Sequence, residues 1–105
     1  MHTADAWTAL GDPTRRGILA RVVRRPSSVT DLARDLPVSR PAVSQHLHVL
    51  LEARLVDVHP RGRQRIYTAR PDGLESMRRE IEMFWTQALA NLKRAAEESY
   101  RHTEE

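Results

Sequence analysis

The sequence predicts a mainly α-helical domain with one small β-hairpin. Three observations support this fold class. Helix-capping residues recur through residues 5–54, two short β-like runs surround a single glycine, and an apolar stripe of helical period then extends over about 22 residues. A chain of 105 residues has room for one compact domain. We therefore expect one domain over 1–105, with the core and hairpin in 5–70, a long helix over 72–98 and a disordered tail over 99–105.

Two helices are predicted before residue 26. Residues 6–10 carry Ala6, Trp7 and Leu10 and indicate a short first helix. Asp12 followed by Pro13 is typical of an N-cap, because a short polar side chain accepts a bond from an unpaired backbone N–H and proline needs no such bond in the first turn. The helical spacing of the apolar residues that follow supports a second helix; they are Ile18, Leu19 and Val22.

Two further helices have the spacing of a helix-turn-helix. Ser28 is the expected N-cap of a helix that ends before Pro37. Ser39 is the expected N-cap of the next helix, which extends to about Arg54 and tolerates Pro41 in its first turn. About three residues separate the two helices, as in helix-turn-helix motifs.

Residues 55–59 and 64–69 are predicted to be the strands of a β-hairpin. The connection between them carries arginines around Gly62, so we expect a flexible, basic loop. A hairpin of this kind after a helix-turn-helix is the wing of a winged helix-turn-helix fold.

The long last helix is expected to dimerise the protein. Asp72, with Glu75 three residues on, resembles a capping box. At ~1.5 Å per residue the helix is more than about 30 Å long, which exceeds what a domain of this size can cover. We expect its apolar stripe to pair with a second copy of the chain, together with the first helix. The predicted homodimer interface consists of Trp7, Leu10, Leu74, Met77, Ile81, Phe84, Trp85, Ala88 and Leu92.

Charge is distributed unevenly along the chain. Residues 1–70 hold 12 arginines and 6 acidic residues, a net charge of +6, whereas residues 71–105 hold 5 basic and 8 acidic residues, a net charge of −3. A basic first part suits a polyanion such as DNA, and an acidic tail would be repelled by phosphate. Charge alone does not separate this interpretation from an ordinary solvated surface.

The helix that Ser39 begins has an apolar and a polar face. On a helical wheel, Val43, Leu47 and Leu50 fall within about 40° of one another and must face the core. The polar residues opposite can read DNA, because glutamine can bond an adenine edge with both amide atoms and arginine can bond guanine or phosphate. We expect His46, beside the apolar stripe, to pack structurally. The predicted DNA-binding residues are Ser39, Arg40, Pro41, Ser44, Gln45 and His48 on this helix and Arg61, Arg63 and Arg65 on the hairpin; a solvated surface is the alternative for each.

Several other functions find no support in the sequence. The absence of cysteine excludes disulfides, thiolate metal sites and cysteine nucleophiles in this chain. No G-x-S-x-G motif or phosphate-binding glycine run occurs, so we do not expect an enzyme. Without an apolar core in residues 1–10 or an apolar run of ~18 residues anywhere, we expect neither a signal peptide nor a membrane partner, and a cytoplasmic location.

From Trp7 to Leu92 the chain resembles the ArsR/SmtB family of bacterial winged-helix repressors. The resemblance rests on LGDPTRRGIL at 10–19, VTDLARDLPVSRPAVSQHLHVLLEARLV at 29–56 and GRQRIY at 62–67. It implies four helices, a hairpin and a long final helix, a homodimer formed through the first and last helices, and repression that a ligand relieves.

The resemblance also implies that metal sites of the family are missing. Metal-sensing members carry a cysteine pair where this chain has Ser28 and Thr30, and hydroxyl groups do not replace thiolates as ligands of soft metals. Another family site uses Asp and His on the last helix, but this chain has no histidine between His59 and His102. We expect no metal and no cofactor, and we leave open whether His2 or His102, near the termini, binds a metal.

The sequence therefore predicts a sequence-specific DNA-binding transcriptional regulator, a dimeric repressor of an inverted-repeat operator. An activator of the same fold and a winged-helix module that binds protein are the alternatives. The inducer, whether a small molecule or a protein, the operator and the regulated genes stay open.

Overall fold

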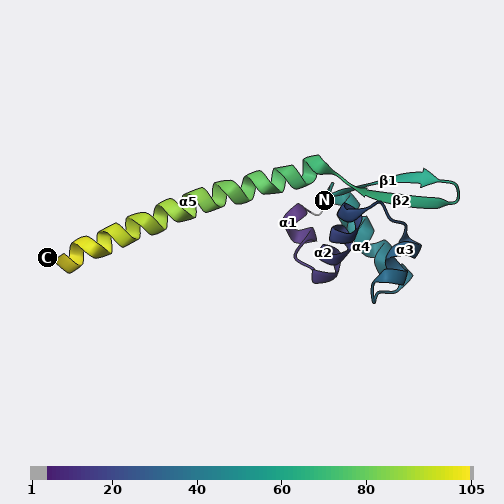
Figure 1. The fold of residues 1–105 in the computed structure, drawn as a ribbon, viewed down its shortest axis with the longest axis horizontal. Coiled ribbons are helices and arrows are strands. Elements are labelled where there is room, and N and C mark those ends of the chain that lie inside the picture. Colours follow the sequence, from purple (N-terminus) through teal and green to yellow (C-terminus); the bar gives the residue numbers. More distant parts are fainter. Residues whose placement is uncertain (1–4, 105) are drawn as a thin grey trace. The chain divides into compact units, whose positions relative to one another are not determined.

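The computed structural model describes residues 5–104, with side chains through residue 101. Its two compact units are the chain up to Leu74 and the chain from Glu75 onward. The observed elements confirm the predicted winged helix-turn-helix fold. In chain order they are α1 (Ala6–Ala9), α2 (Pro13–Arg24), α3 (Val29–Asp35), α4 (Arg40–Glu52), β1 (Val56–Arg61), β2 (Gln64–Ala69) and α5 (Pro71–Glu104) (Figure 1).

The helices of the first unit begin at the predicted capping residues. The carboxylate of Asp12 accepts hydrogen bonds from two backbone N–H groups in the first turn of α2, at 2.7 and 3.2 Å. Ser28 and Asp31 form a complete capping box at the start of α3, each side chain bonding the other's backbone N–H at 3.1 Å. The Ser39 hydroxyl accepts a 3.3 Å bond from the backbone of Ala42 in α4.

One apolar core lies among the helices of the first unit and the base of the hairpin. As the helical wheel predicts, Val43, Leu47 and Leu50 of α4 are completely buried. Burial of such a side chain stabilises the fold by roughly 1.5–3 kcal/mol. This core also includes Ala9 of α1, Ile18, Leu19 and Val22 of α2, Leu32 of α3, Leu55 just before β1, Val56 at the start of β1, and Tyr67 of β2.

The turn between α4 and β1 is tightly constrained. α4 ends at Glu52, and Arg54 has a positive φ of 60°. The backbone N–H of Leu55 donates to the carbonyl of Leu50, and that of Arg54 donates to Leu51, which is the Schellman arrangement. A Cβ atom on Gly73 would lie 2.3 Å from the carbonyl oxygen of Arg54. This close approach requires glycine in the first turn of α5.

The hairpin is more regular than expected. β1 extends to Arg61, and the connection is reduced to two residues, of which Gly62 has a φ of 64°. Glycine is favoured at the first position of such a turn because the residue there has positive φ. Proline has no backbone N–H to donate to a neighbouring strand. Pro60 is tolerated within β1 because the sheet has only two strands, so one edge of β1 has no partner strand at this position. The predicted four-residue loop at 60–63 is therefore wrong in its length, although its place is right.

A short bridge joins the connection between α2 and α3 to the hairpin. Ser27 and Tyr67 exchange two backbone hydrogen bonds, at 2.8 and 3.1 Å, and both residues are buried. The start of the helix-turn-helix is thus fixed to β2 at the middle of that strand.

α5 is one continuous helix that begins earlier and ends later than predicted (Figure 1). It begins at Pro71, so Asp72 lies inside the first turn rather than before the helix, and its carboxylate pairs with Arg70 at 2.9 Å. The tail predicted to be disordered from residue 99 is helical through Glu104, because 99–104 contains neither glycine nor proline to stop the helix. His2 and residue 105 lie outside the described residues, as does the side chain of His102. Within residues 5–104, no helix is both long and apolar enough to cross a membrane.

Candidate nucleic-acid interface

The polar face of α4 is exposed along its whole length. Each of the six residues predicted to contact DNA on this helix is exposed, while the opposite face is buried in the core. Arg40, Ser44 and Gln45 lie in the first two turns, which is the part of a recognition helix that enters a major groove. The remaining members of this exposed set are Ser39, Pro41 and His48.

Two local features shape this polar face. A surface cavity of about 490 Å³ lies beside the first turn of α4 and is lined by Ser39 and Arg40 together with Thr30, Ala33, Arg34 and Val38. Farther along the helix, His48 pairs with Glu52 one turn away. This pair places a carboxylate beside His48, so a phosphate contact by His48 would have to compete with Glu52.

The buried side of α4 is held by an arginine that sequence reasoning did not single out for this role. The Nε–H of Arg15, in α2, donates a 2.6 Å bond to the backbone carbonyl of Ala9, in α1. Its Nη1 lies 3.4 Å from Nδ1 of His46, in α4. Arg15 thus connects three helices, and His46 has the structural packing role expected of it. The sequence carries no local signal for this contact, because Arg15 and His46 are 31 positions apart.

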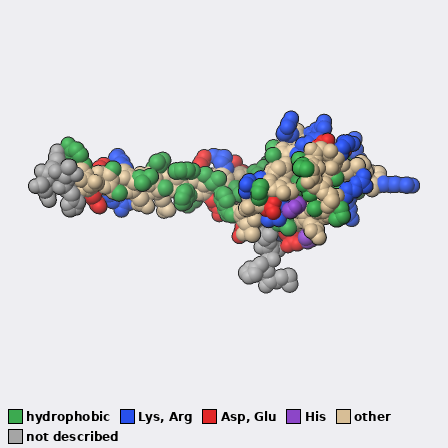
Figure 2. Space-filling view, turned by 90° about the horizontal axis from the view of Figure 1, so that it is seen from below, with side chains coloured by type: hydrophobic (Ala, Val, Ile, Leu, Met, Phe, Trp, Pro, Cys, Tyr) green, Lys and Arg blue, Asp and Glu red, His purple; other side chains and the backbone are tan. Residues whose placement is uncertain are grey.

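The wing presents its predicted arginines to solvent. Arg61 pairs with Gln64 and Pro60 pairs with Arg65, so the register places Arg61 and Arg65 on opposite faces of the hairpin, with Arg63 in the turn between them. All three are exposed, and among the described side chains none of them has an acidic residue within ion-pair distance. Figure 2 shows blue side chains along one edge of the first unit and at the projecting hairpin end on the right.

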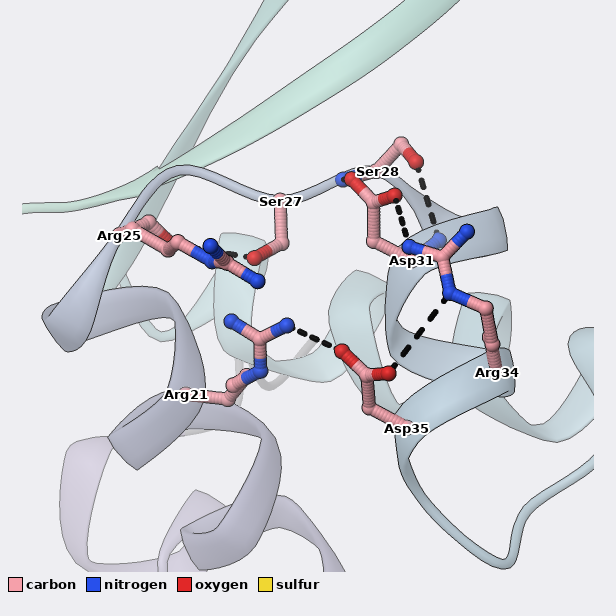
Figure 3. A network of polar contacts seen from close by, with 7 residues as sticks. All are labelled: Arg21, Arg25, Ser27, Ser28, Asp31, Arg34 and Asp35. Carbon is pink, nitrogen blue, oxygen red and sulfur yellow. Dashed lines mark hydrogen bonds and ion pairs between the residues drawn. The ribbon is translucent and has the colours of Figure 1, made fainter.

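A polar network joins α2 to α3 (Figure 3). Arg21 donates a hydrogen bond to one oxygen of the Asp35 carboxylate, and the other oxygen lies 3.7 Å from Nε of Arg34. Arg34 also bonds Asp31 at 2.9 Å. The hydrogen bond from Arg21 lowers the pKa of Asp35, and the charges of Arg21, Arg34 and Arg25 act in the same direction. Sequence reasoning missed this network. Helical spacing could have indicated the pair of Asp31 and Arg34, three positions apart, but no spacing rule indicates the bond between Arg21 and Asp35.

The residues predicted for the dimer interface fall into two groups. Trp7 of α1 and the larger side chains of α5 are well exposed; those of α5 are Ile81, Phe84, Trp85 and Leu92, with 42–65% of each side chain's reference surface accessible. Figure 2 shows exposed hydrophobic side chains along α5. Met77 is buried, and Leu10, Leu74 and Ala88 are half-buried. The rings of Phe84 and Trp85 contact each other edge to face, with 5.9 Å between their centroids.

Met83 and Leu89 of α5 are also exposed but were not predicted for the interface.

Within the described part of the chain, no group of three or more His, Cys, Asp or Glu side chains is arranged to hold a metal ion.

Comparison with known proteins identifies relatives that are all named as transcriptional regulators or repressors. Residues 10–59 match the helix-turn-helix domain family. The chain is similar to the HTH-type transcriptional regulator Rv2034 of Mycobacterium tuberculosis, with 56% identity over 84 residues that span 80% of this chain and 78% of that protein. It is also similar to the transcriptional repressor SmtB homolog of Synechocystis, with 33% identity over 78 residues, 74% of this chain and 59% of that protein.

A solved structure agrees with these sequence relatives. The ArsR-like transcriptional regulator from Rhodococcus sp. RHA1 superposes with a TM-score of 0.74 and 37% identity, covering 87% of this chain and 86% of that one. The relatives are transcriptional regulators rather than enzymes. The exposed polar face of α4, the basic wing and these similarities lead to one conclusion: the chain belongs to the ArsR/SmtB family of winged helix-turn-helix, DNA-binding transcriptional regulators.

Proposed function

We propose that the protein is a dimeric repressor that binds an inverted-repeat DNA operator through α4 and the wing. The observation that carries this proposal is the division of α4 into two faces. Val43, Leu47 and Leu50 are completely buried, so the helix is anchored, while Gln45 and Arg40 stand exposed on its first turns.

The side chains have separate roles in this proposal. Gln45 reads an adenine edge in the major groove, and Arg40 bonds a guanine or a phosphate. Ser44 bonds either a base or the backbone. The wing arginines, Arg61, Arg63 and Arg65, hold the DNA backbone or enter the minor groove, since their opposed faces allow contacts on both sides of the hairpin.

A dimer supplies the second half of the operator contact. The exposed stripe of α5 and the exposed Trp7 support pairing of two chains through their first and last helices. A two-fold dimer places two recognition helices in successive major grooves, and its symmetry would match an inverted repeat.

The relatives favour repression of transcription over activation, since the Synechocystis protein is named a repressor. Bound at a promoter, the dimer would block polymerase. Activation is the alternative, because the sign depends on where the operator lies relative to the promoter. An inducer, either a small molecule or a partner protein, would relieve repression. The proposed repressor needs no metal or cofactor. It acts in the bacterial cytoplasm, where the DNA is.

A salt titration tests DNA binding against the alternative of a protein-interaction module. The DNA upstream of the protein's own gene is labelled and titrated with protein at several salt concentrations, beside a random duplex of equal length. We expect tighter binding to the upstream DNA and a steep fall of affinity with salt, as counterions are released from phosphates. Equal, salt-insensitive affinity for both duplexes would favour the interaction module. Adding a cell extract or a panel of metals to the same assay tests for an inducer.

A further inference from the structure

Three arginines surround a small cavity at the C-terminal end of α2, and none of them is among the residues assigned above to DNA contact. Arg21, Arg24 and Arg25 line this cavity, which has a volume of about 270 Å³. In Figure 3 the guanidinium groups of Arg21 and Arg25 extend toward the same space. The volume is below the range of roughly 300–1,000 Å³ typical of drug-sized ligands, so the arginine pocket, as we call it, suits a small anion or one group of a larger molecule.

The local charge is not balanced by protein carboxylates. The arginine pocket and the adjoining network contain four arginines, the three above and Arg34, against two aspartates, Asp31 and Asp35. Both carboxylates are already engaged, Asp31 in the capping box and with Arg34, and Asp35 with Arg21 and Arg34. Among the side chains described through residue 101, no carboxylate lies within ion-pair distance of Arg24 or Arg25. The pocket therefore has a net positive charge that an anion would neutralise.

One donor group of the arginine pocket, the guanidinium of Arg21, is held in place before any ligand binds. The side chain of Arg21 is only 15% exposed, and its Nη2 is fixed by Asp35. A guanidinium group has five N–H donors, so Arg21 keeps donors for a further acceptor. Ser27 donates a 3.0 Å bond to the backbone carbonyl of Arg25 and is itself bridged to Tyr67, which fixes the backbone beside the pocket. Fixed donors lose little entropy when they bind an oxyanion.

A structural explanation accounts for only part of this arrangement. Cations in the last turn of a helix interact favourably with its C-terminal carbonyl groups, and Arg21 and Arg24 are so placed in α2. Arg25 lies beyond the helix in extended backbone, with φ −165° and ψ 149°, and yet lines the same cavity. A role in helix stability does not require three guanidinium groups to share one space.

We propose that the arginine pocket binds a phosphate group. Planar guanidinium forks match the oxygens of phosphate and bond them in pairs, which makes arginine the residue suited to this group. The phosphate comes either from the DNA backbone, as a contact additional to those of α4 and the wing, or from a free phosphate-bearing ligand. The first source rests on the proposed function, and the second does not.

The test compares the parent chain with Arg24→Ala/Arg25→Ala and with a control pair, Arg79→Ala/Lys93→Ala, which removes the same charge from exposed positions of α5. Arg21 is left in place because its bond to Asp35 joins α2 to α3. Thermal denaturation followed by circular dichroism checks that all variants fold. If the alanine pair does not fold, Arg24→Gln/Arg25→Gln replaces it.

The first arm uses no DNA. Inorganic phosphate and pyrophosphate are titrated into ¹⁵N-labelled protein at ionic strength held constant with sodium chloride, and amide signals are followed by NMR. A free ligand as the source predicts saturable shifts at residues 21–28 in the parent and the control pair, with affinity reduced at least about tenfold in the pocket variant, the loss of roughly one charge-assisted hydrogen bond.

The second arm measures duplex DNA binding against salt by fluorescence anisotropy. A DNA source predicts that the pocket variant has a shallower slope of log affinity against log salt, by about 0.9 for each DNA phosphate that the pocket no longer neutralises, while the control pair keeps the parent slope. Either result supports the proposal and identifies the source. If the pocket variant and the control pair have the same phosphate affinity in the first arm and the same salt slope in the second, the proposal is overturned. A parent protein that does not bind DNA at all would refute the proposed function, and the first arm would then decide the proposal alone.

Discussion

Gly73 and Gly17 are both helical glycines, but the space around them differs. A Cβ on Gly73 would meet the Arg54 carbonyl oxygen at 2.3 Å, whereas a Cβ on Gly17, in α2, would have no atom within 4 Å apart from the neighbouring backbone of its own helix. We expect Gly73→Ala to lower the free energy of unfolding by about 1–3 kcal/mol, because backbone must move to relieve the overlap. Gly17→Ala should raise it by about 0.5–1 kcal/mol through better helix propensity.

Urea unfolding of the two variants beside the parent measures both effects. The two alanine variants serve as each other's control, since the same methyl group is added to a helix in each. Shifts of the same sign in both would contradict the explanation based on the approach of α5 to the turn after α4.

Base reading and backbone contact should separate at the level of single side chains. We expect Gln45→Ala to lose about 1–3 kcal/mol of preference at one base pair, because a bidentate amide contact is removed, with little change on random DNA. Competition binding against operator duplexes that vary one base pair at a time measures the preference. Gln87→Ala is a matched control, since Gln87 is an exposed glutamine of α5.

Arg63→Ala should instead weaken binding to every duplex alike and make the salt dependence shallower, because a phosphate contact carries no sequence information. Arg79→Ala, which removes one exposed arginine of α5, is its control. If Gln45→Ala and Arg63→Ala both bind operator and random DNA as the parent does, the assignment of these residues is wrong.

At the scale of the elements, the N-cap of α2 makes stability depend on pH. The pKa of Asp12 is lowered from its ordinary value of 3.8, mainly because its carboxylate accepts a hydrogen bond from the backbone N–H of Arg15. The folded chain therefore releases this proton more readily than the unfolded chain. The stabilisation by this cap is complete above the unfolded value and is lost as pH falls through the lower folded value.

Asp12→Asn tests this pH dependence, because asparagine is an equally good N-cap that does not titrate. We expect the parent to be more stable than the variant near neutral pH, and the difference to shrink as pH falls below about 4. Urea unfolding of both proteins from about pH 2 to pH 7 measures it. A difference that does not vary with pH would show that the charge of Asp12 contributes nothing to the cap.

The sequence predicted the helices well where their limits depend on interactions between residues close together in the chain. Asp12, Ser28 and Ser39 cap the helices that they were expected to cap, since a cap involves residues only two or three positions apart. The exposed face of α4 followed from helical periodicity in the same way. The limits of β1 and α5 were less accurate, because Pro60 is tolerated at a strand edge and residues 99–104 contain no stop signal.

Contacts between distant parts of the sequence could not be predicted in this way. Arg15 meets His46, Ser27 pairs with Tyr67, and Arg21 bonds Asp35 only because the helices pack in one particular arrangement. No spacing within one element encodes these partners. The arginine pocket belongs to this class, although the run of basic residues in α2 was visible in the sequence.

For the whole molecule, the apolar stripe of α5 predicts the oligomeric state. Trp85 lies on this stripe, and Met83, also exposed, lies about 160° around the helix from it. We expect Trp85→Glu to convert a dimer into a monomer, because a carboxylate buried in an apolar interface is costly. Met83→Glu should leave the dimer intact.

Sedimentation velocity at micromolar concentration distinguishes the two states, and circular dichroism confirms that both variants stay helical. A monomeric parent, or a dimer that survives Trp85→Glu, would refute the proposed interface. Loss of operator affinity together with loss of the dimer would further link the two halves of the proposed function.

The two-residue turn of the wing restricts how its length can change. Successive residues of a strand project to alternate sides, so one amino acid inserted in β2 between Arg65 and the Tyr67 bridge would send Arg65 to the other side. Two amino acids inserted in each of β1 and β2 would restore its orientation, keep every residue paired and lengthen the arm. Changes of wing length should therefore be tolerated in even numbers in each strand, matched between the two strands.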